Sequence, residues 1–248
     1  MSTPGAAPSV DTDDDYALYQ TSTIAALLAG VYDGDVTIAE LLTHGDFGLG
    51  TFNALDGEMV VVDGVCHHLR SDGSVTVAAG TDRTPYAAVM HFHESRSFEI
   101  DQPTGLADLE KRIDDATGGQ NLPVAVRIDG TFRTLRTRTV GVQTKPYPPL
   151  VDAAAHQAVS TLTDSTGTVA GFRTPGFEQA ISVAGYHLHY VDAARRSGGH
   201  VLDLELASGR VSLGPIRELR LVLPSTEEFA HADLDLDRLA AQEKQAEG

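Results

Sequence analysis

The sequence predicts an α+β fold that is rich in β-strand and divided into two domains. Much of the chain consists of short runs in which apolar and polar residues alternate, as in strands that bury one face. Patterns with a helical period are few. Three prolines at positions 146–149 cannot lie in a helix or a central strand. We therefore expect an N-terminal domain of mixed sheet and helices at residues 16–150 and a smaller C-terminal antiparallel β domain, ending in a helical tail, at residues 151–248.

The composition argues for a soluble cytoplasmic protein. Lysine and arginine total 18 and aspartate and glutamate 35, so the net charge is 18 − 35 = −17, which disfavours nucleic acid and anionic membranes as partners. Residues 1–15 are small, polar and acidic, which predicts a disordered arm and not a signal peptide. No run approaches the 18 apolar residues of a membrane span. Cys66 is the single cysteine and excludes an intrachain disulfide.

Before the prolines, the pattern predicts three helices among short strands. The second half of residues 16–31 suits a short helix, and residues 36–44 suit another, with Asp35 as its cap and Gly45 as its stop. The clearest helix spans residues 106–116, with Thr104 before it and two glycines after it. The expected strands lie at residues 48–53, 58–62, 75–79, 87–92, 98–101, 124–128 and 131–140. The last two read as a hairpin that turns at Asp129-Gly130.

After the prolines, the chain again alternates as strands do. The expected strands lie at residues 168–172, 181–190, 200–206, 210–213 and 218–223. Ser225 and Glu228 have the spacing of a capping box that opens a helix. Residues 233–248 have a helical composition.

Three histidines suggest a metal site. In a strand, His187 and His189 project from the same face. A short loop with Gly198-Gly199 follows, and if the next strand returns as a hairpin, His200 lies beside His189. Three neutral imidazoles on a rigid sheet leave one position open, as a catalytic zinc site requires. The motif alone does not choose between zinc, iron, copper and nickel, and two surface histidines would give the same pair.

Other reactive residues offer weaker patterns. His91 and His93 form a second His-x-His but have no third histidine returning to them. His67 and His68 are adjacent, so a strand points them to opposite faces. Cys66 has no nucleophile context, and no Gly-x-Ser-x-Gly elbow is present.

One glutamate and two arginines complete the candidates. Glu58 heads an apolar strand just after a tight turn, where a solvated carboxylate is the ordinary interpretation. Arg136 and Arg138 share a face of their strand and suit a carboxylate clamp, or else an exposed basic face on an acidic protein.

The chain resembles the acetolactate decarboxylase family. The matching pieces occur in the same order along nearly the whole chain after the arm. They are residues 16–32 (YALYQTSTIAALLAGVY), 33–35 (DGD), 48–53 (GLGTFN), 55–59 (LDGEM), 127–132 (RIDGTF), 137–139 (TRT), 145–150 (KPYPPL), 185–189 (GYHLH) and 199–200 (GH). Together they are more specific than any single motif.

The resemblance implies a usually dimeric zinc enzyme that converts 2-acetolactate to acetoin and carbon dioxide. It implies zinc ligands at His187, His189 and His200, and a smaller C-terminal domain that is β-barrel-like and carries the metal site. It implies catalytic roles for Glu58 and Arg138, with Thr51 nearby. It also places a glutamate of the tail at the site, for which we expect Glu247, with Glu243 as the alternative.

The implied chemistry agrees with these residue types. Decarboxylation of a 2-hydroxy-3-oxo acid leaves an electron pair that delocalises as an enediolate, which a metal ion would stabilise. Arg138 would orient the carboxylate, and Glu58 would deliver a proton to the enediolate. The alternatives are a cupin-type metal-dependent oxygenase or isomerase, and a non-catalytic binding module with a structural metal.

Overall fold

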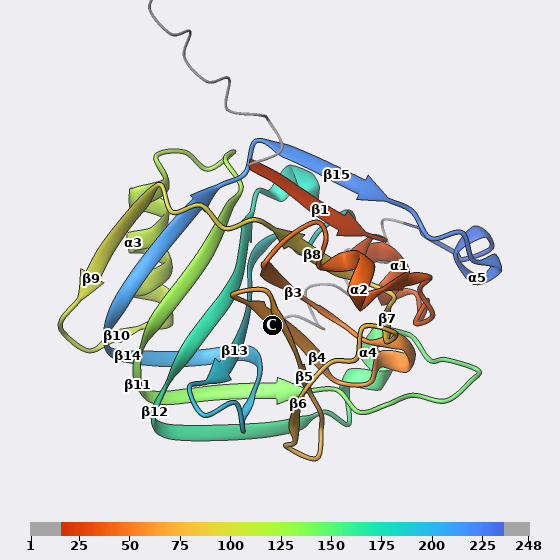
Figure 1. The fold of residues 1–248 in the computed structure, drawn as a ribbon, viewed down its shortest axis with the longest axis horizontal. Coiled ribbons are helices and arrows are strands. Elements are labelled where there is room, and N and C mark those ends of the chain that lie inside the picture. The colour runs from red at the N-terminus through yellow and green to blue at the C-terminus, as the bar shows by residue number, and fades with distance from the viewer. Residues whose placement is uncertain (1–15, 236–248) are drawn as a thin grey trace, which may run out of the picture.

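The computed structural model describes residues 16–235, and two large β-sheets form the body of this part of the chain (Figure 1). The prediction of a mostly β fold with few helices is confirmed. The expected disordered arm at residues 1–15 lies outside the described residues, as does most of the expected helical tail.

The first sheet is mixed and has seven strands. Their order is β15 (Glu218–Val222), β1 (Ala17–Thr21), β8 (Ala87–Met90), β3 (Phe47–Thr51), β4 (Glu58–Val62), β5 (Val65–Leu69) and β6 (Val75–Val77). β1 and β15 run parallel, and the other pairings are antiparallel. The sequence analysis missed β1 and β5. Both are buried on both faces along almost their whole length, so they lack the alternation on which the prediction relied.

The second sheet is built from long antiparallel strands. Its order is β10 (Thr104–Gly105), β14 (Gly198–Pro215), β11 (Val124–Thr139), β12 (Ala158–Thr174) and β13 (Gly185–Asp192), and β9 (Arg96–Ile100) pairs with the far half of β14. β13 also pairs with β14 over three residues. A separate small sheet joins β2 (Val36–Thr37) to β7 (Arg83–Thr84).

The predicted hairpin at Asp129-Gly130 is wrong, because β11 runs straight through this dipeptide. Gly130 lies opposite Gly167 of β12 and Gly209 of β14, so three glycines meet across three strands. A Cβ atom on Gly130 would lie 2.6 Å from the carbonyl oxygen of Ser208. The Asp-Gly pair therefore marks a close approach of strands and not a turn. The strands expected at residues 200–206 and 210–213 are likewise one continuous strand, β14.

A β-bulge in β11 decides which way its second half faces. Val126 and Ile128 lie in the core on one face of the second sheet, and so does Leu135, although its number has the opposite parity. The pairing of β11 with β14 shifts register between Phe132 and Thr134, which leaves Arg133 as the extra residue. Because one extra residue reverses the alternation, the even-numbered residues beyond the bulge face the first sheet.

The helices are short except for one. They are α1 (Ile24–Leu28), α2 (Ile38–Leu41), α3 (Leu106–Thr117), α4 (Leu150–Ala154) and α5 (Glu227–Ala230), with 3-10 turns η2 (Asn53–Leu55) and η3 (Gly176–Glu178). The predicted α3 is confirmed and ends at Gly118, whose φ is 80°. The predicted caps Asp35 and Ser225 are wrong, because the side chains of Thr37 and Thr226 accept the capping hydrogen bonds of α2 and α5.

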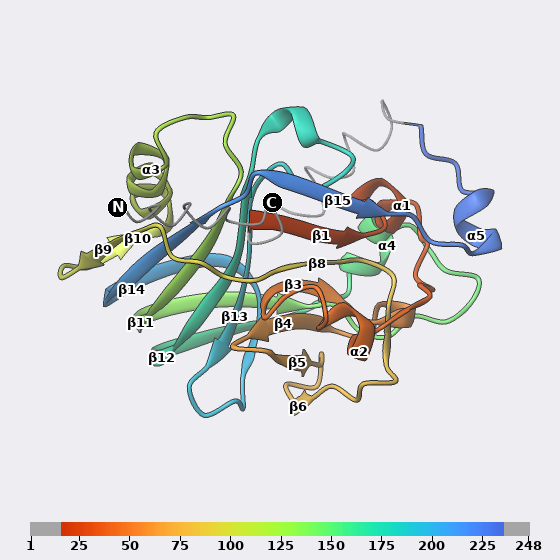
Figure 2. The ribbon, with the colours of Figure 1, turned by 45° about the horizontal axis from the view of Figure 1, so that its top comes forward.

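The two sheets pack face to face (Figure 2). The core between the sheets joins residues of the first sheet, such as Leu49 and Val60, to Ala170 and Phe172 of the second. α3 packs with Leu109 on the outer face of the second sheet, and α2 packs with residues of the first. The functional site described below lies at the edge of this inter-sheet core.

Strand pairing crosses the predicted boundary at residue 150 in both sheets. β11 lies before it and pairs with β12 and β14 after it, while β15 returns from the end of the chain to pair with β1. The division at residues 16–150 and 151–248 stays a prediction, and a cut at residue 150 would separate strands that share a sheet. Among residues 16–235, no helix has the length and apolar character to cross a membrane.

Candidate active site

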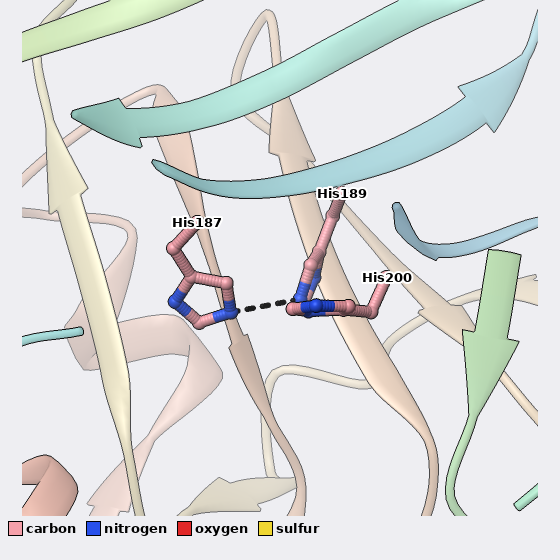
Figure 3. Close-up of side chains that lie close together, drawn as sticks. All are labelled: His187, His189 and His200. Carbon is pink, nitrogen blue, oxygen red and sulfur yellow. Dashed lines mark hydrogen bonds between the residues drawn. The ribbon is translucent and has the colours of Figure 1, made fainter. Parts of the chain in front are cut away.

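Three buried histidines converge between the two sheets (Figure 3). His187 and His189 point from one face of β13, and His200 of β14 lies directly opposite His189 in the antiparallel ladder. One ring nitrogen from each of the three lies within 4.8 Å of the others. The exposed fractions are 8%, 1% and 4%. The predicted hairpin return and the convergence of the three side chains are therefore confirmed.

Two glycines allow the strands to meet this closely. Gly198 and Gly199 pair with Val191 and Tyr190 at the start of β14. A Cβ atom on Gly198 would lie 2.2 Å from the carbonyl oxygen of Tyr190, and one on Gly199 would lie 2.6 Å from that of Arg138. Cβ atoms essentially never lie this close to another atom, so only glycine lets His200 follow directly beside both neighbouring strands.

The hydrogen bond of His189 fixes its tautomer. Its Nδ1 lies 2.8 Å from the carbonyl oxygen of Met59, which can only accept, so Nδ1 carries the proton and donates. Nε2 therefore presents a lone pair, 3.2 Å from Nε2 of His187 and 3.6 Å from Oε2 of Glu58. A backbone carbonyl that orients a histidine in this way is typical of metal-ligating histidines.

The three imidazoles are held neutral. Burial lowers the pKa of His187 to about 3, with the Arg138 guanidinium as a second cause. Burial, and then nearby imidazole and guanidinium groups, also lowers the pKa of His189 and of His200 well below the usual value. Neutral imidazole is the form that ligates metals. The donor set and the fixed tautomer thus fit a metal ion that prefers nitrogen ligands.

Glu58 and Thr51 face each other across the ends of β4 and β3. Glu58 lies on the same face of β4 as Val60 and Val62, which pack between the sheets, so its carboxylate points at the histidines and is only 9% exposed. The Thr51 hydroxyl donates a 2.6 Å hydrogen bond to the Gly57 carbonyl oxygen. Thr51 therefore ties the end of β3 to the residue just before Glu58.

Arg138 reaches the site because of the bulge in β11. Its Nη2 lies 3.3 Å from Nε2 of His200, and the residue is 6% exposed. Arg136 lies two residues earlier and is exposed, outside the pocket, so the expected pair of arginines does not converge. Glu58, Arg138 and the three histidines therefore line the same cavity.

That cavity is a pocket with an empty volume of about 440 Å³, including its open mouth. The three histidines, Glu58, Thr51 and Arg138 lie on its polar side. Its other wall is mainly apolar and comes from α1, α4 and neighbouring loops, through Ile24, Leu27, Leu55, Tyr86, Val140, Leu150 and Ala154. Sequence reasoning missed this wall, because apolar residues of short helices give the same pattern whether they line a pocket or fill a core.

The remaining predicted residues lie elsewhere. His91 and His93 are exposed, and among residues 16–235 they form no group of three possible ligands. His67 and His68 are buried in β5 outside the pocket. Burial raises the pKa of the Cys66 thiol to about 12, which makes it unreactive. Glu247 and its alternative Glu243 lie outside the described residues.

Comparison with known proteins gives a consistent result. The family model for alpha-acetolactate decarboxylase matches residues 18–236. The alpha-acetolactate decarboxylase of Bacillus subtilis strain 168 is 42% identical over 231 residues, which are 93% of this chain and 91% of that protein. The one from Raoultella terrigena is 44% identical over 227 residues, which are 92% of this chain and 88% of that protein.

Comparison with solved structures leads to the same family. The crystal structure of the Bacillus subtilis strain 168 alpha-acetolactate decarboxylase superposes with a TM-score of 0.92 at 42% identity, covering 94% of this chain and 99% of that one. A Staphylococcus aureus protein described as similar to alpha-acetolactate decarboxylase superposes with a TM-score of 0.90 at 33% identity, covering 93% and 99%. The chain therefore belongs to the alpha-acetolactate decarboxylase family.

Proposed function

We propose that this chain is a zinc-dependent carboxy-lyase that converts 2-acetolactate to acetoin and carbon dioxide. Membership of the family supports the reaction. The single structural observation that carries the proposal is the buried group of His187, His189 and His200 facing Glu58 across one pocket. A decarboxylase of a hydroxy-oxo acid needs a centre of positive charge and a proton donor beside one small cavity, and this pocket holds both kinds of group.

The three histidines would hold the zinc ion. All three are neutral and buried, and nitrogen donors on a rigid sheet suit zinc with one position left open. When bound, zinc supplies a Lewis acid for the negative charge that loss of carbon dioxide creates. Iron and copper also accept imidazole, so metal analysis is part of the test below.

Arg138 would orient the substrate. Its guanidinium is buried beside His200 and has the planar, two-pronged geometry that matches a carboxylate. A substrate carboxylate placed there would leave the scissile carbon–carbon bond next to the histidines. The apolar wall of the pocket would accept the methyl groups and exclude water from the reacting carbon.

Glu58 would handle the proton. Loss of carbon dioxide leaves an electron pair that delocalises into the ketone as an enediolate, and acetoin forms when the carbon that lost carbon dioxide takes up one proton. The Glu58 carboxyl lies on one side of the pocket, so it would deliver this proton to one face and set the configuration of acetoin. Thr51 supports this role through its hydrogen bond to the Gly57 carbonyl oxygen.

Three further features are proposed from the family resemblance. They are a homodimer, a β-barrel-like C-terminal domain, and a Glu247 side chain that reaches the metal site. A cytoplasmic location is proposed from the composition. The extra pairing of β13 with β14 supports the barrel-like description. A comparison of E247Q with E243Q tests the tail glutamate, because only the variant of the residue at the site should lose turnover.

The deciding experiment measures acetoin release from racemic 2-acetolactate, with metal content read on the same sample before and after chelation. We expect about one zinc per chain, with activity lost on removal and restored on return. Zinc without acetoin would contradict the reaction but keep the site. Bound iron with consumption of dioxygen would favour the cupin-type oxygenase, and a closed site without activity would favour a binding module.

A further inference from the structure

The loop that connects Thr51 to Glu58 is held in an unfavourable backbone conformation. Ala54, Leu55 and Gly57 have φ values of 60°, 56° and 81°. Alanine and leucine rarely adopt left-handed backbone, which costs on the order of 1–2 kcal/mol per residue and persists only where neighbouring groups impose it. Backbone hydrogen bonds of Ala54 with Tyr32 and Gln143 hold the middle of the loop. Glu58 follows this loop directly, so the groups that hold the loop and its ends also fix where the carboxylate begins.

His68 contacts both ends of this loop. It lies on β5, opposite Met59 of β4, and its side chain is 4% exposed. Its ring stacks on Phe52, with the centroids 3.7 Å apart and the planes 19° from parallel. Its Nε2 forms a hydrogen bond with the carbonyl oxygen of Asp56. One side chain therefore binds the residue after Thr51 and a residue two before Glu58.

Arg70 sets the tautomer that this contact needs. Its Nη2 lies 2.9 Å from Nδ1 of His68, and a guanidinium can only donate, so Nδ1 is the acceptor. The proton of the neutral imidazole is then on Nε2, where it is donated to the Asp56 carbonyl oxygen. Nε of Arg70 also lies 3.5 Å from Oδ2 of Asp56, which adds an ion pair to the same end of the loop.

His68 lies outside the reaction pocket. It is absent from the lining that the three histidines, Glu58 and Arg138 share, and it faces a separate polar pocket with Asp56 and Arg70. Any effect of His68 on catalysis is therefore indirect, and its side chain contacts the loop at Phe52 and Asp56.

We propose that His68 is a positioning residue that holds the 52–57 loop in its strained conformation and thereby aims the Glu58 carboxylate at the reacting carbon. This inference rests on the proposed decarboxylation for its kinetic test, but the position of Glu58 can be measured without any activity. The stacked ring restrains the start of the loop, and the Nε2–H group restrains its end.

The kinetic test compares H68F with H68Q. H68F keeps a ring over Phe52 but removes the donor, and a displacement of about 1 Å at a catalytic group can cost about a hundredfold in rate. We expect its kcat to fall roughly ten- to a hundredfold, with KM and zinc content unchanged, and the enantiomeric excess of acetoin to drop. H68Q keeps an N–H group at the position of Nε2 and should recover most of the loss.

Two controls separate positioning from general damage. H67F changes the adjacent histidine of β5, which is equally buried but points to the other face, and should keep the wild-type kcat and enantiomeric excess. On the E58Q background, H68F should cause no further loss, since a residue that acts only through Glu58 has nothing left to position. Equal losses from H68F on both backgrounds, or wild-type kcat and stereochemistry in H68F, would overturn the proposal.

A structural measurement keeps the proposal independent of the substrate. Crystal structures of the wild type and H68F should show the Glu58 carboxylate displaced in the variant, with the three histidines in place. An unmoved carboxylate would overturn the role of His68 even in an active enzyme. A wild-type enzyme that releases no acetoin would contradict the proposed function, while a displaced Glu58 in H68F would still support the positioning.

Discussion

His189 and His200 are a cross-strand pair, with ring centroids 5.3 Å apart and planes at 69°. Only ten residues separate them in the chain, and the backbone ladder of β13 and β14 sets their spacing. His187 joins them from the next position on the same face of β13, at centroid distances of 5.0 Å and 5.2 Å. The geometry of the three histidines therefore depends on the sheet itself and not on a flexible loop, so a metal site proposed there would be formed before a metal binds.

Replacing His187 with alanine should remove the metal and the activity together. Two imidazoles cannot complete the three-ligand set that a catalytic zinc needs. We expect the zinc content of H187A after purification to fall to a small fraction of the wild-type value, measured by mass spectrometry of the metal. H93A is the matched control, because His93 belongs to the exposed His-x-His pair and should keep full zinc. Full zinc occupancy in H187A would show that the ligand assignment is wrong.

Replacing Glu58 with glutamine should abolish most turnover while zinc remains. Glutamine has the size of glutamate but cannot deliver a proton, and loss of a positioned acid or base typically costs about a hundred- to ten-thousandfold. The measurements are kcat for acetoin release and zinc content on one sample. E94Q is a suitable control, since Glu94 lies in a surface network with Arg210 and Ser212. Near-normal turnover in E58Q would remove Glu58 from the mechanism.

Replacing Gly199 with alanine should destabilise the protein, because the added Cβ atom would clash with the neighbouring strand beside the site. The added Cβ would lie 2.6 Å from the Arg138 carbonyl oxygen and 3.1 Å from the Thr137 Cβ, and φ at Gly199 is 150°. Overpacking of this kind costs about 1–3 kcal/mol. We expect a lower urea midpoint and weaker zinc retention than in the wild type. G176A is the control, because nothing lies within 4 Å of its Cβ position, and its unfolding free energy should change by less than about 0.5 kcal/mol.

The sequence allowed the histidine group to be predicted but not the way in which the site is assembled. His187, His189 and His200 come from one local pattern, a strand and its hairpin return, so period and loop length were sufficient. Arg138 reaches them only because Arg133 is an extra residue in β11, and no residue type marks that bulge. Asp129-Gly130 even indicated a turn where the strand continues.

The position of Glu58, on the first sheet, could not be predicted from the local sequence pattern either. The apolar strand that Glu58 begins was visible in the sequence, but not which face of β4 would meet the second sheet. The Met59 carbonyl that orients His189 left no sequence signal, because any residue provides a carbonyl. Contacts between distant strands are set by packing, and only the family resemblance connected Glu58 and Arg138 to the histidines in advance.

The metal-free protein should lose stability as the pH falls below about 6.5. Burial lowers the pKa of His67, His68, His187, His189 and His200. In the unfolded chain, the pKa of each histidine returns to about 6.5. Below that pH the unfolded state therefore binds more protons than the folded state. The free energy of unfolding therefore decreases as the pH falls, by up to about 1.4 kcal/mol per pH unit for each such histidine. For His187, the effect extends down to its folded pKa of about 3.

The measurement is the urea midpoint of the chelated protein between pH 7.5 and 5.0, a range that ends above the ordinary pKa of aspartate and glutamate. We expect a flat stability above about pH 7 and a progressive fall below 6.5. H67F removes one of the five groups without changing the three proposed metal ligands, so its stability should fall less steeply with acid than that of the wild type. Equal slopes in H67F and the wild type would mean that His67 is not held neutral by its burial in β5.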